Sequence, residues 1–222
     1  MPKKKAKRPF NVSIIGPPLS GKGTQADKLT EVLQLPHLVM SQLLKAAAKK
    51  GDKESKIIQE TMARGELVPS SIQFRVLRDG ITHKNVSQGF IIEGVPRRYQ
   101  EALYFNSLVD VDFLIHIALP VKELIKRASG RRQCSCGATY SLVYKPPKKA
   151  GLCDLCGQKL FIRPDDKPAV IKRRMVFYNK EIKGIAKLYQ KENKFIEING
   201  AQSIEQVFQE ILRKIIYFLQ NQ

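Results

Sequence analysis

The chain has 222 residues, of which 43% are apolar, and this predicts one or two folded domains and excludes wholesale disorder. The formal net charge is +19, which favours an anionic partner such as a nucleotide, a nucleic acid or an anionic membrane surface. The sequence has no apolar run approaching the roughly 18 residues of a membrane-spanning helix, and none follows the basic start as in a secretory signal. We therefore expect no membrane span.

The chain begins with a strongly basic segment. The first ten residues carry five positive charges and two prolines, and we predict that residues 1–9 form a disordered, solvated tail. Weak contact with nucleic acid, or a nuclear address, is the alternative reading. The remaining chain is also basic.

Strand and helix patterns then alternate along the chain. Short apolar runs bounded by Gly or Pro predict five strands, at 11–15, 36–39, 90–93, 112–119 and 194–199. Helical patterns are at 21–35, 41–50, 53–64, 70–79, 100–107, 121–128, 169–191 and 204–219. This alternation predicts an α/β fold, with helices on both faces of a parallel sheet. Residues 131–168 break the pattern and predict a small inserted module.

A glycine-rich loop follows the first predicted strand and opens a predicted helix. It reads GPPLSGKGT over residues 16–24, and in this context backbone N–H groups and the helix N-terminus bind phosphate. Lys22 supplies a point charge for the outer phosphates. Leu19 is costly if its position needs a positive φ, and weaker binding of the phosphates would follow.

All four cysteines lie in the inserted module. Cys134 and Cys136 are followed by 16 residues and then by Cys153 and Cys156. Two close pairs at this separation predict a structural zinc site with four sulfur ligands. The first pair is C-x-C, one residue shorter than C-x-x-C, so we expect Cys134 to ligate with strain or not at all. A three-cysteine site with another ligand, a disulfide and free thiols are the alternatives.

Five segments together resemble the adenylate kinase family of nucleoside monophosphate kinases. They are GPPLSGKGTQ (16–25), GELVP (65–69), GFIIEGVPR (89–97), RASGRR with CGATY (127–140), and RPDD followed by Lys172, Arg173 and Arg174. The resemblance runs from about Phe10 to the C-terminus. It implies a five-stranded P-loop core over 10–39, 70–130 and 169–222. It also implies a helical monophosphate-binding part over 40–69 and a zinc-type lid over 131–168.

The resemblance implies reversible, Mg²⁺-dependent transfer of the ATP γ-phosphoryl group to AMP, giving two ADP. It assigns catalysis to Lys22, Arg97, Arg131, Arg163, Arg174, Asp165 and Asp166. We expect the two acids to pair with the lid arginines and to favour closure. It assigns ATP binding to Gly16, Pro18, Ser20, Gly21, Lys22, Gly23, Thr24, Arg127, Arg131 and Tyr140, with Arg127 stacked on the adenine. It assigns monophosphate binding to Met40, Lys45, Leu67, Val68, Gly94, Arg97, Glu101, Arg163 and Arg174.

Several residues are left with simpler expectations. Glu93 stands where the family has an Asp that holds Mg²⁺ through water, and Tyr140 is as often core as nucleotide contact. Arg98 and Arg173 have no matching family role and are expected at the surface. His37, His83 and His116 have no partners at ligand or catalytic spacing, and we expect them to be structural.

The acceptor region departs from the family pattern. Met40 replaces a hydroxyl that bonds the acceptor base, and Lys45 replaces an arginine. Glu101 replaces a Gln that reads adenine, although Gln100 is adjacent and a one-residue shift could restore it. A carboxylate accepts only, so it could take the N1–H and N2–H donors of guanine. We hypothesise a weakened preference for AMP, shifted towards GMP.

The interpretation that we favour is an adenylate kinase acting as a cytoplasmic monomer. The alternatives are a monophosphate kinase with an altered acceptor, such as GMP, and a catalytically weak nucleotide- or RNA-binding protein on the same fold. The high positive charge supports the last alternative, while Lys22 and the retained arginines argue against it.

Overall fold

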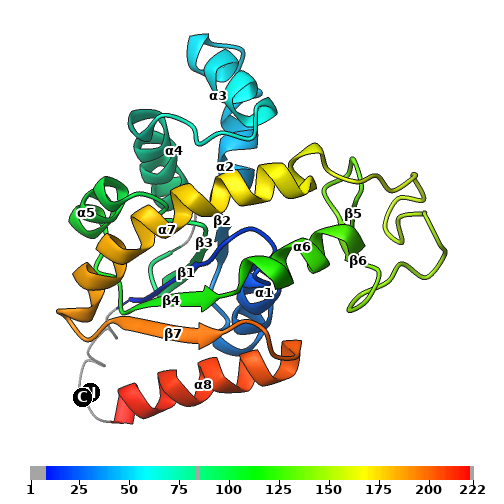
Figure 1. The fold of residues 1–222 in the computed structure, drawn as a ribbon. Coiled ribbons are helices and arrows are strands. Elements are labelled where there is room, and N and C mark those ends of the chain that lie inside the picture. The colour runs from blue at the N-terminus through cyan, green and yellow to red at the C-terminus, as the bar shows by residue number, and fades with distance from the viewer. Residues whose placement is uncertain (1–8, 84–85, 221–222) are drawn as a thin grey trace, which may run out of the picture.

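The computed structural model describes residues 9–83 and 86–220, so most of the predicted basic tail lies outside the described residues. A five-stranded parallel sheet forms the centre, in the order β2-β3-β1-β4-β7 (Figure 1). Its strands are β1 (Phe10–Ile15), β2 (His37–Val39), β3 (Gly89–Glu93), β4 (Phe113–Ala118) and β7 (Phe195–Asn199). The five predicted strands are confirmed, with shifts of one residue at several ends.

Eight α-helices surround the sheet in the described part of the chain. They are α1 (Lys22–Leu33), α2 (Met40–Ala47), α3 (Lys53–Ala63), α4 (Ser70–His83), α5 (Tyr99–Leu108), α6 (Val121–Gly130), α7 (Pro168–Gln190) and α8 (Ile204–Gln220). Each corresponds to a predicted helical pattern. No described helix is both long enough and apolar enough to cross a membrane.

Side chains alternate between the two faces of the sheet, and each face has its own core. Ile14 of β1 and Ile115 of β4 pack on one side with residues of α1 and α8. Ile92 of β3 and Leu114 of β4 pack on the other side with residues of α2 to α5 and α7. The three central strands, β3, β1 and β4, are therefore buried on both faces, as continuous apolar runs in a parallel sheet require, whereas the edge strand β7 exposes Glu197 and Asn199. The predicted fold class is confirmed.

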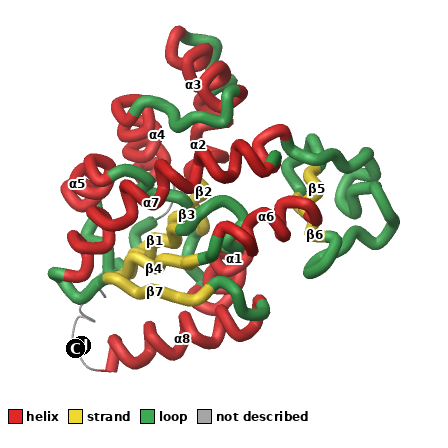
Figure 2. Tube along the Cα trace, in the orientation of Figure 1, coloured by secondary structure: helices red, strands yellow, loops and turns green. Residues whose placement is uncertain are grey.

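Residues 131–168 form a small unit beside the ends of α6 and α7 (Figure 2). It contains the antiparallel pair β5 (Arg131–Gln133) and β6 (Thr139–Ser141) and a short 3-10 helix, η1 (Pro164–Asp166). Its buried centre comprises Cys134, Tyr140 and Cys153. A core this small gives little hydrophobic stabilisation, so the unit needs another source of stability.

Candidate functional site

The phosphate loop connects β1 to α1 with the strained backbone that the sequence suggested. Gly21 has φ 89° and Leu19 has φ 67°, so the positive φ suspected at Leu19 is present. A Cβ at Gly16 would lie 2.8 Å from the carbonyl oxygen of Ile117, so only glycine fits there. Helix α1 begins without a side-chain cap and without an acidic residue in its first turn. Its terminal N–H groups are therefore oriented to bind an anion.

Lys22 lies at the centre of a cluster of positive charges. Its Nζ donates to the carbonyl oxygen of Pro17 at 3.3 Å. Burial lowers the pKa of Lys22 to about 8, Glu93 opposes this, and Arg97, Arg174 and Arg131 lower it further by repulsion. The structure thus brings together four of the predicted catalytic cations. Such a concentration of buried charge is stabilised by an anion with several negative oxygens, such as a polyphosphate.

A carboxylate faces this cluster from the end of β3. A Cβ added at Gly23 would lie 3.1 Å from Oε2 of Glu93, which places the carboxylate against the phosphate loop. Nε2 of His37 lies 3.9 Å from the same oxygen, and Nδ1 of His37 lies 3.0 Å from Oδ1 of Asp27. His37 therefore has two carboxylate neighbours that the sequence spacing did not reveal. A carboxylate beside a phosphate site is a suitable donor for Mg²⁺, which keeps several of its waters.

Arg131 is held by Asp166. Nε of Arg131 donates to Oδ2 of Asp166 at 2.8 Å, and Nη2 donates to Oδ1, so the pair is bidentate. The Asp166 carboxyl is almost fully buried. The predicted pairing of a lid arginine with this acid is confirmed for these two residues. Arg163 immediately precedes η1 and is partly buried, while the side chain of Asp165 lies outside the described residues.

Arg127 connects the phosphate loop to the turn after β7. Its guanidinium donates to the carbonyl oxygens of Gly200 at 2.7 Å and Leu19 at 3.4 Å. Its Cζ also lies 5.4 Å from the ring centroid of Tyr144. The side chain is partly exposed beside the loop, and the stacking on adenine that the resemblance implies stays a prediction.

A cavity of about 430 Å³ opens beside this cluster. Lys22, Arg97 and Arg174 line it, together with Arg98 and Phe177. The other lining residues come from the phosphate loop, the 65–67 segment, the 94–96 turn and α7: Ile15, Gly16, Pro18, Gly65, Glu66, Leu67, Gly94, Pro96, Arg173 and Tyr178. The volume is in the range of small-molecule sites.

Sequence reasoning missed several of these lining residues. Phe177 and Tyr178 lie four residues after Arg173 and Arg174, so a helix places each on the same face as the corresponding arginine. Helical spacing from Arg174 was therefore a signal for Tyr178. Arg98 was expected at the surface, but it lines the cavity and is hydrogen-bonded to Glu101. Arg173 is exposed as expected, although it also lines the cavity.

The four cysteine sulfurs come together in the inserted unit. All lie within 4.8 Å of one another, and the Sγ atoms of Cys134 and Cys156 are 3.3 Å apart. Zn–S bonds of about 2.3 Å in a tetrahedron give sulfur separations of about 3.8 Å, so the arrangement fits Zn²⁺. Cys134 thus lies with the other three sulfurs despite the short C-x-C spacing, and whether it binds a metal with strain stays a prediction. The cysteines are not disulfide-bonded.

Tyr140 belongs to this cysteine unit. Its side chain is buried, its hydroxyl lies 3.4 Å from Sγ of Cys153, and the N–H of Asp154 donates to that hydroxyl at 2.8 Å. This hydrogen bond to the sulfur lowers the pKa of Cys153 to about 6, which favours the thiolate that a metal binds. The structure therefore supports the core interpretation of Tyr140 over nucleotide contact.

Comparison with known proteins gives one consistent result. A family model described as adenylate kinase matches residues 14–194. The chain belongs to the adenylate kinase family. It is 34% identical over 207 residues to an adenylate kinase of Methanosarcina barkeri, covering 91% of this chain and 96% of that protein. It is 35% identical over 212 residues to an adenylate kinase of Thermosipho africanus (93% and 99%) and 38% identical over 200 residues to one of Methanocella arvoryzae (87% and 93%).

The membership makes the chain a phosphotransferase of the nucleoside monophosphate kinase type. The phosphate loop and the paired acid and arginine lie within the matched residues, which begin near the end of β1. Within this adenylate kinase homologue, the residues that were expected to bind the acceptor are not all placed as the sequence suggested.

Met40 and Lys45 occupy different environments on α2. Met40 is fully buried and packs in the core with Leu44 and Val68, so packing is its visible role. Lys45 is exposed on the same helix. Gly94 and Leu67 line the cavity, whereas Val68 is buried beneath it. Contact of Met40 and Lys45 with a monophosphate stays a prediction.

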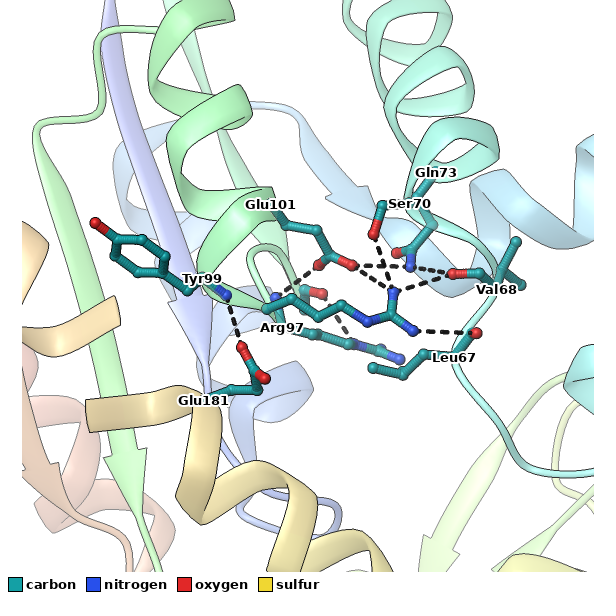
Figure 3. Close-up of polar contacts among 10 residues, drawn as sticks. Leu67, Val68, Ser70, Gln73, Arg97, Tyr99, Glu101 and Glu181 are labelled. Atoms are coloured by element: carbon teal, nitrogen blue, oxygen red, sulfur yellow. Dashed lines mark hydrogen bonds and ion pairs between the residues drawn. The ribbon is translucent and has the colours of Figure 1, made fainter. Parts of the chain in front are cut away.

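Glu101 is not available in the way the sequence suggested. It is only 2% exposed and lies in a network drawn in Figure 3. Its Oε2 accepts the N–H of Arg97 at 2.8 Å, and its Oε1 accepts from Arg98 Nη1 at 2.8 Å and from Gln73 Nε2 at 3.1 Å. The expectation that this carboxylate presents free acceptors to a guanine is therefore corrected, because the chain's own donors occupy it.

Arg97 is positioned by the same network. Its Nε donates to the carbonyl oxygen of Gly94 at 3.0 Å while its N–H binds Glu101. Burial lowers the pKa of its guanidinium, and the carboxylates of Glu101 and Glu93 oppose that effect. The guanidinium is held at the cavity wall, beside the Lys22 cluster.

Proposed function

We propose that the chain catalyses reversible, Mg²⁺-dependent transfer of the ATP γ-phosphoryl group to AMP, giving two molecules of ADP. The observation that carries the proposal is the convergence of Lys22, Arg97, Arg131 and Arg174 beside a cavity that opens from the phosphate loop. Phosphoryl transfer needs positioning and charge stabilisation more than covalent chemistry, and this cluster supplies both.

Each of these residues has a distinct part in the mechanism. The N–H groups of the loop 16–24 bind the ATP phosphates, and Lys22 holds the outer ones. Arg97 orients the acceptor phosphate by its planar fork. Arg131, Arg163 and Arg174 stabilise the negative charge that spreads over the equatorial oxygens in the transition state.

The metal ions have separate roles in this proposal. Glu93 would hold Mg²⁺ through water, and the ion would neutralise charge on the phosphates when bound. The four cysteines would hold Zn²⁺ with no open position, so that ion is structural. It would stabilise a unit whose own core is small.

The predicted division of the chain is part of the proposal. Residues 40–69 bind the acceptor, and residues 131–168 close over ATP and exclude water, which otherwise accepts the phosphoryl group. The Arg131–Asp166 pair joins the two ends of this lid segment and orients Arg131. We further propose that the enzyme acts as a monomer in the cytoplasm.

A second candidate acceptor is supported by the replacements on the acceptor side. Met40 and Lys45 both lack groups that the resemblance assigns to acceptor binding, which favours a monophosphate kinase with a changed base preference. A catalytically weak nucleotide- or RNA-binding role is less well supported, because the chain retains Lys22 and the arginines that phosphoryl transfer needs.

The test is ADP formation from ATP and Mg²⁺ with AMP, GMP, CMP and UMP supplied separately at equal concentration. Rapid turnover with AMP supports the proposal. Turnover mainly with another monophosphate supports the second candidate. Tight ATP binding without turnover on any acceptor contradicts both and leaves the binding role.

A further inference from the structure

Arg98 is the residue whose role the sequence did not reveal. It lies next to Arg97, its side chain is 26% exposed, and it lines the cavity. Its Nη1 donates to Glu101 at 2.8 Å and to the carbonyl oxygen of Val68 at 3.1 Å, and its Nη2 donates to the carbonyl oxygen of Leu67 at 3.3 Å. One guanidinium thus connects the 67–68 segment to α5.

These contacts occupy the Val68 and Glu101 acceptors behind Arg98. The carbonyl oxygen of Val68 accepts from Arg98 and also from Gln73 Nε2 at 2.7 Å, which fills both of its lone pairs. Oε1 of Glu101 accepts two donors, Oε2 accepts one, and the carboxylate is buried. A ligand in the cavity therefore meets Arg98 in front of the Val68 and Glu101 acceptors, which the chain's own donors already occupy.

The surroundings of Arg98 suit a purine ring. Its Cζ lies 5.8 Å from the ring centroid of Phe177, which also lines the cavity. A planar guanidinium and an aromatic ring are both surfaces on which a base packs. The cations that bind phosphate, Lys22 and Arg97, line the same cavity. A nucleoside monophosphate with its phosphate on those cations has its base within reach of this wall.

The chemistry of the wall then discriminates between bases. An exocyclic amino group at purine C6 donates hydrogen bonds and needs acceptors, whereas a 6-oxo group accepts and matches an arginine fork. We propose that Arg98, held by Glu101, is a specificity-determining residue, so that 6-oxopurine monophosphates such as IMP are used at least as efficiently as AMP. This inference rests on the proposed function and names its acceptor class.

The experiment compares AMP with IMP, which differ in the groups at C6 and N1 and share the sugar and phosphate. We measure kcat/KM for each with ATP and Mg²⁺. The wild type is expected to give a ratio of AMP to IMP of about one or below. The double variant Arg98→Ala/Glu101→Gln removes both charges, leaves no unpaired buried carboxylate and frees the carbonyls. It is expected to raise the ratio about tenfold, the equivalent of one hydrogen bond to the base.

Two further variants keep the result interpretable. Arg173→Ala removes an exposed arginine from the same cavity. We expect the KM values for AMP and IMP to change together, so that the ratio of kcat/KM for AMP to that for IMP stays fixed. Arg98→Lys preserves the charge beside Glu101 but loses the planar fork of donors. It is expected to raise the AMP to IMP ratio as well, and it replaces the double variant in the experiment if that variant does not fold.

A wild-type preference for AMP above about 30-fold overturns the inference, and so does a ratio that none of the Arg98 variants moves. Absence of turnover with every acceptor refutes the proposed function instead. In that case calorimetric titration with AMP and IMP gives the same ratio from binding alone, and the inference stands or falls on it.

Discussion

Replacing Lys22 by methionine separates what the phosphate loop needs for function from what it needs for stability. Methionine keeps an unbranched side chain and removes the charge. Burial lowers the pKa of Lys22 from 10.5 to about 8, which at 1.36 kcal/mol per pKa unit corresponds to about 3 kcal/mol of penalty on the charged form. The variant also loses the hydrogen bond from Lys22 Nζ to the Pro17 carbonyl oxygen, which cancels about 1 kcal/mol of the gain in stability. We expect the variant, without nucleotide, to be more stable by about 2 kcal/mol.

That gain raises the melting temperature by about 4–8 °C for a chain of this size. The gain also depends on pH. Below pH 8 Lys22 is charged in both the folded and the unfolded chain, and the full penalty applies. As the pH rises from 8 towards 10.5, the folded chain releases its proton first and the penalty is lost, so the difference between variant and wild type shrinks.

The assay is thermal unfolding without nucleotide at pH 6.5 and pH 9.5. Lys126→Met is the matched control, because the Lys126 side chain is 70% exposed and its removal shifts stability little at either pH. ADP formation by Lys22→Met falls at least a hundredfold. A variant that is less stable than the wild type at pH 6.5, or a difference that is the same at both pH values, refutes the reasoning.

Three further outcomes are expected. Arg127→Ala raises the KM for ATP about tenfold and leaves the KM for the acceptor unchanged, because Arg127 braces the phosphate loop; an equal rise in both KM values contradicts this. Asp166→Asn removes the buried carboxylate from Arg131, lowers kcat about tenfold and lowers the free energy of unfolding by about 1–3 kcal/mol; steady-state kinetics and denaturant titration measure the two effects. Elemental analysis gives one zinc per chain, and Cys153→Ser loses it and melts at lower temperature; an unchanged melt shows that the lid needs no metal.

The order of strands and helices was predictable because local patterns carry it. Apolar runs bounded by Gly or Pro, such as Phe90–Glu93, predict strands, and the structure confirms them with small shifts. The positive φ of Leu19 was foreseen as a condition of the loop. The pairing of Arg131 with Asp166 followed from charge and the family pattern.

The acceptor wall was not predictable, because long-range contacts build it. The sequence spacing of Arg98 and Glu101 does not indicate that the Arg98 guanidinium reaches the carbonyl oxygens of Leu67 and Val68, about thirty residues earlier in the chain. The same contacts turn Glu101 inward. The cysteines show the same limit, since the C-x-C spacing left the part of Cys134 open, and only the folded chain shows its sulfur beside the other three.

The central claim is direct transfer of a phosphoryl group between two nucleotides. Its most direct test follows the label from [γ-³²P]ATP in the presence of Mg²⁺ and AMP, with Arg97→Ala beside the wild type. The account predicts label in the β-phosphate of the newly formed ADP, and loss of that transfer in Arg97→Ala while ATP still binds. Label recovered only as inorganic phosphate, at equal rates in both proteins, contradicts it.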